Sequence, residues 1–208
     1  MPDRAAHWEG VYGARADDRL SWHEDDPSVS LDLARAAGLT ADTSVIDIGG
    51  GTSRLAAALR ARGLRDVTVL DLSQAALERS RACLGAEGDG IAWIVADVTR
   101  WTPSRTWDLW HDRAAFHFLV EPADRAAYLD RLDRSLVPGG HAIIATFAPD
   151  GPETCSGLPV ARYSPESLAA ELGGSFSLVA HRRHAHVTPW GTPQNFQFSL
   201  FRKAPTPA

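Results

Sequence analysis

A run of three glycines beside an aspartate is the first feature of this sequence with chemical meaning. Asp47 lies near the end of a short apolar run, and Gly49, Gly50 and Gly51 follow it. Glycine lets the backbone approach a ligand with no side chain between them, and three in succession are costly unless such an approach is needed. The pattern therefore predicts a strand-to-helix turn that binds a nucleoside or a phosphate.

The spacing of this turn does not fit a pyrophosphate. The dinucleotide fingerprint needs a glycine or alanine three residues after Gly51, and that position is Arg54. The carboxylate of Asp47 would also repel phosphates, whereas it could bind the ammonium group of an amino-acid moiety. We therefore expect a ligand without phosphates, and a nicotinamide-dependent oxidoreductase becomes a remote alternative.

Two further acids follow the next two predicted strands. Asp71 lies at a position where an acid in such sheets accepts hydrogen bonds from ribose hydroxyls. Asp97 follows the third strand, where a carboxylate can read an adenine amine. We expect Asp71 with Leu72, and Asp97 with Val98, to contact a nucleoside.

A polar group also follows the predicted fourth strand, where a doubly wound sheet opens a crevice. His111 can take a proton near neutral pH, Asp112 could orient it or bind a cationic acceptor, and Arg113 could bind a substrate anion. We predict catalytic roles for His111 and Asp112, ligand contact by His111, and substrate contacts for Arg113 and His117. The alternative is a polar turn whose groups satisfy one another.

The elements that must position these residues alternate between strand and helix. Short apolar runs predict strands at 44–48, 67–70, 91–95, 107–111 and 141–146. Helical patterns lie between them at 28–37, 54–62, 73–84 and 124–136. Parallel strands need such crossovers, so the alternation predicts a parallel sheet with helices on both faces.

Residues at the ends of these helices indicate where each one starts and stops. Ser28 and Ser73 are predicted N-caps, Gly38 a helix stop, and residues 138–140 (PGG) the stop after the last crossover helix. The final third differs, with a helix at 165–172 and two long strands at 176–186 and 195–202. A turn joins these strands and predicts an antiparallel pair at a sheet edge.

In order and spacing, these motifs resemble those of the class I S-adenosylmethionine-dependent methyltransferases. The resemblance rests on residues 45–53 (VIDIGGGTS), 70–71 (LD), 96–97 (AD) and 136–140 (LVPGG), and it covers roughly residues 27–147. Ser53 departs from the family pattern, where a third glycine is usual.

The resemblance implies an α/β fold, with a Rossmann-like, doubly wound sheet of seven strands. Most strands would be parallel, with a C-terminal antiparallel pair and the order 3-2-1-4-5-7-6. It also implies S-adenosylmethionine as cofactor and S-adenosylhomocysteine as product, with Asp71 on the ribose, Asp97 at the adenine and residues 47–51 around the methionine portion.

The N-terminal segments 7–12 and 20–23 resemble the lead-in of a branch that includes thiopurine-like small-molecule enzymes and protein-lysine methyltransferases. In that branch an aromatic lead-in folds over the cofactor. Tyr12 and Trp22 are therefore expected at the substrate, with Trp22 also at the cofactor, because an aromatic face stabilises a sulfonium by up to about 2 kcal/mol. The alternative is that both anchor an N-terminal helix to the core.

The resemblance implies transfer of a methyl group by in-line displacement to a nitrogen, oxygen or sulfur atom. A small-molecule acceptor is favoured because little sequence remains for a protein-docking module. Protein-lysine N-methylation is the alternative, and a cofactor-binding scaffold without catalysis is a remote one.

Length and charge limit the remaining possibilities. The 208 residues, 44% of them hydrophobic, predict one domain over residues 1–203, with a lead-in or lid at 1–27, a core at 28–203 and a disordered tail at 204–208. The formal charge of −5 includes no basic block, which argues against a nucleic-acid partner. No apolar stretch predicts a membrane span or a signal peptide, so we expect a cytoplasmic monomer or homodimer.

Metal and disulfide chemistry have little support in the sequence. Cys83 and Cys155 are too few and too far apart for a disulfide framework or a cysteine metal site. His184 and His186 share one face of a predicted strand, but no third ligand is evident. No metal is predicted, because a stable zinc site typically needs three or four ligands.

Overall fold

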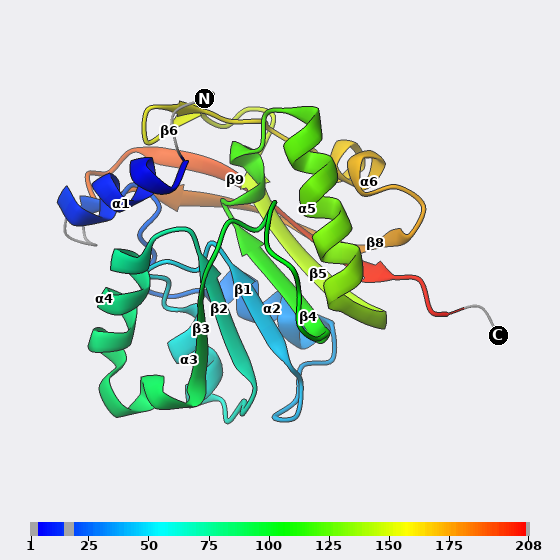
Figure 1. The fold of residues 1–208 in the computed structure, drawn as a ribbon. Helices are drawn as coiled ribbons and strands as arrows, with labels where there is room; N and C mark the ends of the chain where they lie inside the picture. The colour runs from blue at the N-terminus through cyan, green and yellow to red at the C-terminus, as the bar shows by residue number, and fades with distance from the viewer. Residues whose placement is uncertain (1–3, 15–18, 207–208) are drawn as a thin grey trace.

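Seven strands form one sheet in the computed structural model, which describes residues 4–14 and 19–206 (Figure 1). They are β1 (Val45–Ile48), β2 (Val67–Asp71), β3 (Ile91–Val95), β4 (Trp107–Arg113), β5 (Leu136–Phe147), β8 (Phe176–Val187) and β9 (Pro193–Lys203). The order is β3-β2-β1-β4-β5-β9-β8. Strands β1 to β5 are parallel, and β9 runs antiparallel to both β5 and β8. The predicted seven-stranded topology is confirmed.

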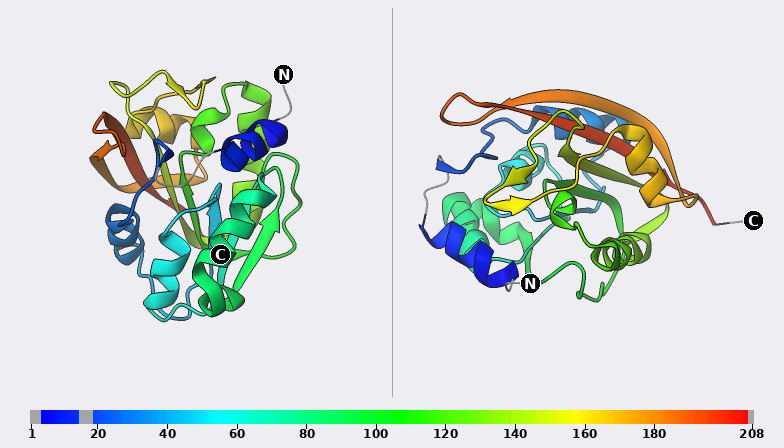
Figure 2. Two further views of the ribbon diagram at one scale, coloured as in Figure 1. Left: turned by 90° about the vertical axis from the view of Figure 1, so that its left-hand side faces the viewer. Right: turned by 90° about the horizontal axis from the view of Figure 1, so that it is seen from above.

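Six α-helices and a small hairpin complete the described chain. The helices are α1 (Arg4–Ala14), α2 (Ser28–Ala36), α3 (Leu55–Ala61), α4 (Gln74–Leu84), α5 (Pro122–Ser135) and α6 (Pro165–Leu172). Two 3₁₀ turns lie at Gly85–Gly90 and Phe116–Phe118, and the hairpin pairs β6 (Thr154–Cys155) with β7 (Leu158–Pro159). Helix α1 crosses the end of the sheet near α4, while the C-terminal strand β9 runs away from α1 (Figures 1 and 2).

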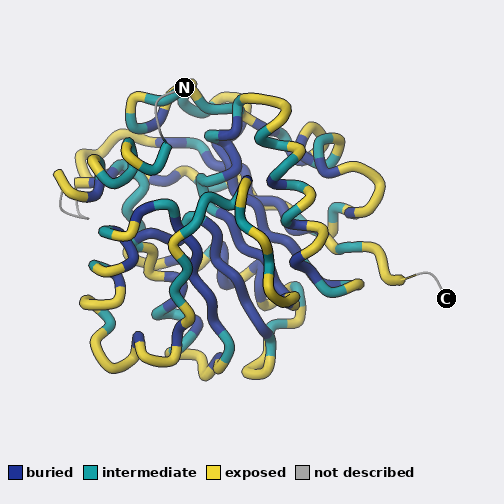
Figure 3. Tube along the Cα trace, in the orientation of Figure 1, coloured by how far each residue is buried: buried dark blue, intermediate teal, exposed yellow. Residues whose placement is uncertain are grey.

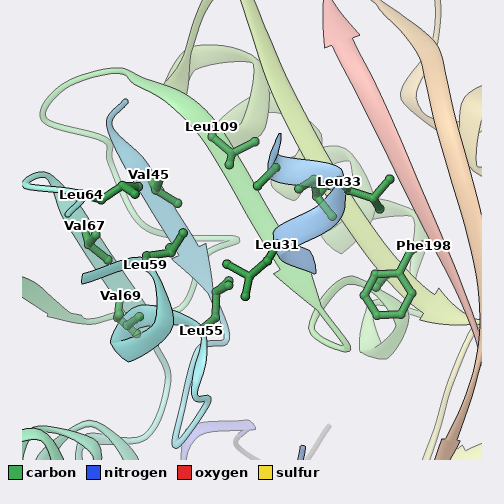
Figure 4. Packing of buried hydrophobic residues seen from close by; sticks show 14 of the residues in the cluster. Leu31, Leu33, Val45, Leu55, Leu59, Leu64, Val67, Val69, Leu109 and Phe198 are labelled. Carbon is green, nitrogen blue, oxygen red and sulfur yellow. The ribbon is translucent and has the colours of Figure 1, made fainter. Parts of the chain in front are cut away.

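Alternate residues of the strands build a core on each face of the sheet, as the strand period of two requires. Helices α2, α3 and α4 cover one face, where Leu33 and Leu59 pack with Val45 (Figure 4). Helices α5 and α6 cover the other, where Leu132 packs with Ile46. The strands are buried along most of their length, and exposure is concentrated in helices and turns (Figure 3).

Two predicted helix signals are confirmed and one is wrong. Ser73 caps α4, since its Oγ accepts a hydrogen bond from the Ala76 amide at 3.1 Å. Gly38 follows α2 with a φ of +85°, the left-handed conformation of a helix stop. Ser28, however, is the first helical residue, and Pro27 occupies the cap without a side-chain hydrogen bond.

The predicted stop at residues 138–140 is also wrong. Helix α5 starts earlier, at Pro122 in the favoured first turn, and ends at Ser135. Strand β5 begins at once and runs through the proline and both glycines. The register between β4 and β5 shifts between Trp107 and Leu109, so these residues lie in a strand irregularity, where proline and glycine are tolerated.

Across the described part of the chain, none of the helices combines the length and apolar character needed to cross a bilayer. Residues 15–18 of the predicted lead-in and 207–208 of the predicted tail lie outside the described residues.

Candidate functional site

A cavity of about 810 Å³ lies at the carboxyl ends of β1 to β4. Eight of the predicted site residues line it: Tyr12, Trp22, Gly49, Asp71, Leu72, Asp97, Val98 and Arg113. A smaller space of about 480 Å³ adjoins it and shares Tyr12, Trp22, Gly49 and Arg113. That second space is also lined by Asp47, Gly50 and His111. Predicted residues Gly51, Asp112 and His117 line neither space.

The glycine turn is tight because other parts of the protein pack directly against it. A Cβ on Gly49 would lie 2.7 Å from the Cβ of Ala115, and one on Gly50 would lie 2.6 Å from Val69 Cγ1. Gly49 and Gly51 have φ values of +65° and +45°, and a Cβ on Gly51 would strike the Tyr12 hydroxyl. Internal packing therefore requires glycine here, and the half-buried Gly49 still lines the cavity.

Asp71 ends β2 on the cavity wall with its carboxylate almost fully buried. The amide of Ser73 donates to it at 2.8 Å. Burial, with a smaller contribution from the Asp47 carboxylate, raises the pKa of Asp71 to about 6, although backbone N–H donors at Ser73, Gly51 and Leu72 oppose the shift. A polar ligand that donates hydrogen bonds to this carboxylate would stabilise its charged form.

Asp97 also lines the cavity, but both of its oxygens already have partners. Oδ1 accepts hydrogen bonds from the amide and hydroxyl of Thr99, and Oδ2 accepts one from Arg4 Nη2 at 2.9 Å. Partial burial by itself would raise the pKa of Asp97, but the Thr99 and Arg4 contacts lower it overall. Arg4 lies on α1 and also pairs with Asp124 at 3.3 Å.

His111 lies in a buried network instead of open space. Its Nδ1 is 2.7 Å from Asp47 Oδ1 and its Nε2 is 2.9 Å from Ser30 Oγ, so both ring nitrogens are engaged. Asp47 and His111 are register partners on β1 and β4, which places their side chains together on the α2 face. The described structure gives Asp47 Oδ2 no hydrogen-bond partner. This geometry does not support the predicted role of His111 as a general base.

Asp112 points away from His111, because consecutive strand residues face opposite sides of a sheet. It is fully buried on the α5 face, where it accepts hydrogen bonds from the amides of Ala115 and Phe116 and from the Tyr128 hydroxyl at 2.7 Å. Burial raises its pKa to about 6 against these donors. The predicted catalytic role of Asp112 is therefore corrected to a structural one, holding the loop after β4.

His117 is likewise structural in its contacts. It is fully buried, and its Nδ1 accepts a hydrogen bond from the Phe147 amide at 3.3 Å. Burial, with a smaller effect from Arg113, lowers its pKa to about 3. The predicted substrate contact by His117 is not supported, because this residue lines neither space.

Arg113 is the one residue of the predicted polar group that lines the large cavity. Its Nη1 donates to the Trp22 carbonyl oxygen at 2.8 Å, and its guanidinium carbon lies 5.0 Å from the centre of the Phe196 ring. Glu24 Oε2 is 3.5 Å from Nε. Neither Glu24 nor Phe196 was predicted from the sequence, since they come from a loop and an edge strand with no motif.

Helix α1 lies over the cavity, where aromatic contacts and the carboxylate of Glu9 help to hold it. Trp8 packs edge-on against Trp22 and Phe118, with ring centroids 5.6 and 5.0 Å apart. Glu9 accepts hydrogen bonds from the first amides of α4, including the Gln74 amide at 2.6 Å, where a negative charge also suits the helix dipole. Arg4, Trp8 and Glu9 were not predicted as site residues, because their contacts join α1 to segments far away in the sequence.

Glu24 also belongs to a cluster of possible metal ligands that was not predicted from the sequence. Glu24 lies beside His184 and His186, and one potential ligand atom from each falls within 4.8 Å of the others. His186 Nε2 donates to the Ser21 carbonyl oxygen at 2.7 Å. The positive charge of Arg113 beside Glu24 opposes a divalent cation, so these three groups alone do not make a metal centre.

A family model described as a methyltransferase domain matches residues 45–140. The trans-aconitate 2-methyltransferase of Methylobacterium radiotolerans is 35% identical over 146 residues, which are 70% of this chain. The chain spans about half the length of that curated relative, namely 50%.

Solved structures extend the likeness over nearly the whole chain. A structure concerning conversion of a disulfide bond into a thioacetal group during echinomycin biosynthesis has a TM-score of 0.77 at 21% identity, covering 99% of this chain and 94% of that one. The N-methyltransferase NodS from Bradyrhizobium japonicum, in complex with S-adenosylhomocysteine, has a TM-score of 0.70 at 18% identity, covering 97% and 99%.

A third structure holds both an acceptor and the cofactor product. The 1,6-didemethyltoxoflavin-N1-methyltransferase of Burkholderia thailandensis, with bound 1,6-didemethyltoxoflavin and S-adenosylhomocysteine, has a TM-score of 0.68 at 22% identity. The match covers 96% of this chain and 84% of that one. At these identities the likeness establishes a common fold.

Proposed function

We propose that the chain is a class I S-adenosylmethionine-dependent methyltransferase that moves a methyl group from S-adenosylmethionine to a small molecule. The observation that carries the proposal is the cavity in which Asp71, Leu72, Asp97 and Val98 lie together beside Gly49. These residues come from the ends of three strands of the sheet, where doubly wound folds bind nucleosides.

The cavity fits the nucleoside half of the cofactor. The Asp71 carboxylate is the ribose acceptor in this assignment, and Leu72 and Val98 supply apolar surface for the adenine ring. Asp97 would receive the adenine amine, although its oxygens now hold Thr99 and Arg4. Binding there therefore involves sharing or displacing the Arg4 contact.

The adjoining space fits the methionine portion. Asp47 Oδ2 is buried beside Gly50 and lacks a hydrogen-bond partner within the described chain, which suits a cofactor ammonium group. His111 and Ser30 would then act as positioning residues that hold the other Asp47 oxygen in place.

S-Adenosylmethionine supplies a sulfonium-bound methyl group and a good leaving group, so positioning and exclusion of water can provide most of the acceleration. The protein's part is to hold reactants in line. Trp22 and Tyr12 line both spaces and are proposed to border the methyl group, with Trp22 available to stabilise the cation.

A small-molecule acceptor is supported by the cover that α1 forms over the cavity, which leaves little room for a folded partner. The named relatives act on small molecules or natural products, as their names state. Protein-lysine methylation remains the second candidate, favoured by the acidic surface charge alone.

Titration calorimetry with S-adenosylhomocysteine tests the cofactor assignment. We expect saturable binding to the wild-type protein, and binding by Asp71→Ala that is weaker by about 10- to 100-fold, the range for a lost charge-assisted hydrogen bond. The exposed Asp150→Ala substitution serves as the control and should bind normally. No heat of binding at about millimolar ligand, with the protein folded, would reject the assignment.

A second experiment separates the two acceptor classes. The protein is incubated with methyl-labelled S-adenosylmethionine and a cell extract divided into protein and small-molecule fractions. We expect label in the small-molecule fraction, and label confined to protein would favour lysine methylation.

A further inference from the structure

Arg113 is a buried cation with unused hydrogen-bond donors on the wall of the cavity. Its side chain is 13% exposed. One donor, Nη1, is used on the Trp22 carbonyl oxygen. Nε and Nη2 are buried without a hydrogen-bond partner among the described residues. Because more than nine in ten buried polar groups find a partner, two open donors on one guanidinium point to a missing acceptor.

The nearest carboxylate does not satisfy these donors. Glu24 Oε2 lies 3.5 Å from Nε, which makes an ion pair without a hydrogen bond. Burial lowers the pKa of Arg113 overall, and the negative charges of Glu24 and Asp47 partly oppose this shift. The guanidinium still stays charged, as it does in proteins generally. Nη2 therefore remains a charged donor for which the described part of the chain supplies no acceptor.

The position of Arg113 separates it from the two acids assigned to the nucleoside, although it also borders the space assigned to the methionine portion. Asp71 and Asp97 follow β2 and β3, on one side of β1 in the sheet order. Arg113 ends β4 on the other side, and its neighbours in the cavity include Phe196 of β9 and Cys155 of β6. This half of the cavity is the part left for an acceptor once the nucleoside occupies the β2 and β3 ends.

We propose that Arg113 binds a carboxylate of the methyl acceptor, so that the substrate class is small carboxylic acids. This inference rests on the proposed function. The planar guanidinium matches a planar carboxylate, and a charge-assisted pair in a desolvated pocket is strong. The Phe196 ring lies against the cation and Trp22 lines the same cavity, so an apolar or aromatic body attached to the carboxylate fits these walls. An uncharged analogue would leave the donors open and bind poorly.

Calorimetry on the protein saturated with S-adenosylhomocysteine tests whether Arg113 binds a carboxylate. The carboxylate probes are benzoate, phenylacetate and succinate. Benzamide serves as the uncharged counterpart of benzoate. We expect at least one carboxylate to bind and benzamide to bind at least about tenfold more weakly. Arg113→Gln should weaken carboxylate binding by about 10- to 100-fold, and Arg113→Lys by less. Arg183→Gln, which alters an exposed arginine paired with Asp150, should bind as the wild type does.

Two controls keep the result interpretable. Removing Arg113 leaves Glu24 buried without its counter-charge, so the double variant Glu24→Gln/Arg113→Gln is measured alongside, and circular dichroism checks that each variant is folded. S-adenosylhomocysteine and 5′-methylthioadenosine, which lacks the amino-acid portion, are titrated against every variant.

The outcomes are distinct. If Arg113→Gln weakens S-adenosylhomocysteine but not 5′-methylthioadenosine, the bound carboxylate belongs to the cofactor and the proposal is wrong. If no probe carboxylate binds the cofactor-loaded wild type up to about 10 mM, or if Arg113→Gln binds it equally well, the proposal is also wrong. Failure of the wild type to bind S-adenosylhomocysteine would instead reject the proposed function.

Discussion

At the scale of single residues, neighbouring side chains at the end of β4 have different roles. His111 and Arg113 face the α2 side, whereas Asp112 between them faces α5. A strand period of two dictates this separation, so Asp112 could not have oriented His111. The residue that orients His111 is Asp47, its register partner on the neighbouring strand.

We expect His111→Ala to act mainly on stability. Removal of the ring leaves the Asp47 carboxylate and the Ser30 hydroxyl buried without partners, which should lower the free energy of unfolding by about 2 kcal/mol or more. Denaturant titration measures this, with the exposed His181→Ala as control. Normal stability combined with lost methyl transfer would restore the base role for His111.

Asp71 should make cofactor binding depend on pH. Its pKa of about 6 in the free protein lies above the ordinary value of 3.8, and ribose hydroxyls donate to the ionised form. Affinity for S-adenosylhomocysteine should therefore be full above about pH 7 and fall as the pH drops through 6. Calorimetry over this range checks the trend, and Asp71→Asn should bind weakly with a flatter profile. A wild-type profile that is already flat would argue against ribose binding by this carboxylate.

At the scale of elements, charged contacts add to the aromatic packing of Trp8 in holding α1 over the cavity. Arg4 reaches Asp97 and Glu9 reaches the start of α4, so the helix depends on charged contacts from both of its halves. Arg4 itself lines the cavity, so we expect binding of the cofactor to affect this end of the helix.

Glu9→Gln should loosen α1. It removes the charge that caps α4, an effect of about 1 kcal/mol, and should speed dissociation of S-adenosylhomocysteine about fivefold. Stopped-flow measurements give the rate, and hydrogen exchange should show faster exchange over residues 4–14. Glu78→Gln, an exposed change on α4, provides the matched control. Equal rates for the two variants would mean that Glu9 does not restrain the helix.

Sequence patterns predicted the helices and strands better than they predicted contacts between distant side chains. Local periodicity predicted the alternation of strands and helices, and the family resemblance supplied the strand order, which the structure confirms. The Pro138 stop failed because tertiary pairing with β4 continued the strand through residues that locally favour a turn. The ion pair of Arg4 with Asp97 and the approach of Glu24 to Arg113 join distant segments, and no local pattern encodes such pairs.

At the scale of the whole molecule, buried acids and buried histidines make the stability of the protein depend on pH in opposite directions. Their effects on stability therefore partly cancel. Asp71 and Asp112 have raised pKa values, so the stability they contribute is present below about pH 4 and is lost as the pH rises through 6. His117 and His186 have lowered pKa values, about 3 and 4, so stability falls as the pH drops below 6.5.

We expect the free energy of unfolding to change little between pH 6 and 4 for this reason. Asp112→Asn removes one of the acids, so its stability should fall more steeply with acid than that of the wild type. His117→Leu should fall less steeply. Urea titrations across this range test the slopes, which remain informative even where a substitution also lowers the overall stability. Three parallel slopes would contradict the balance.

The placement of the two cysteines offers a practical handle. Cys155 is buried, whereas Cys83 is exposed on α4, the helix against which α1 rests. A thiol-reactive dye would therefore attach selectively at Cys83 without mutagenesis. Trp8 on α1 would serve as its intrinsic quencher or energy donor, so the position of the helix could be followed as an optical signal during turnover.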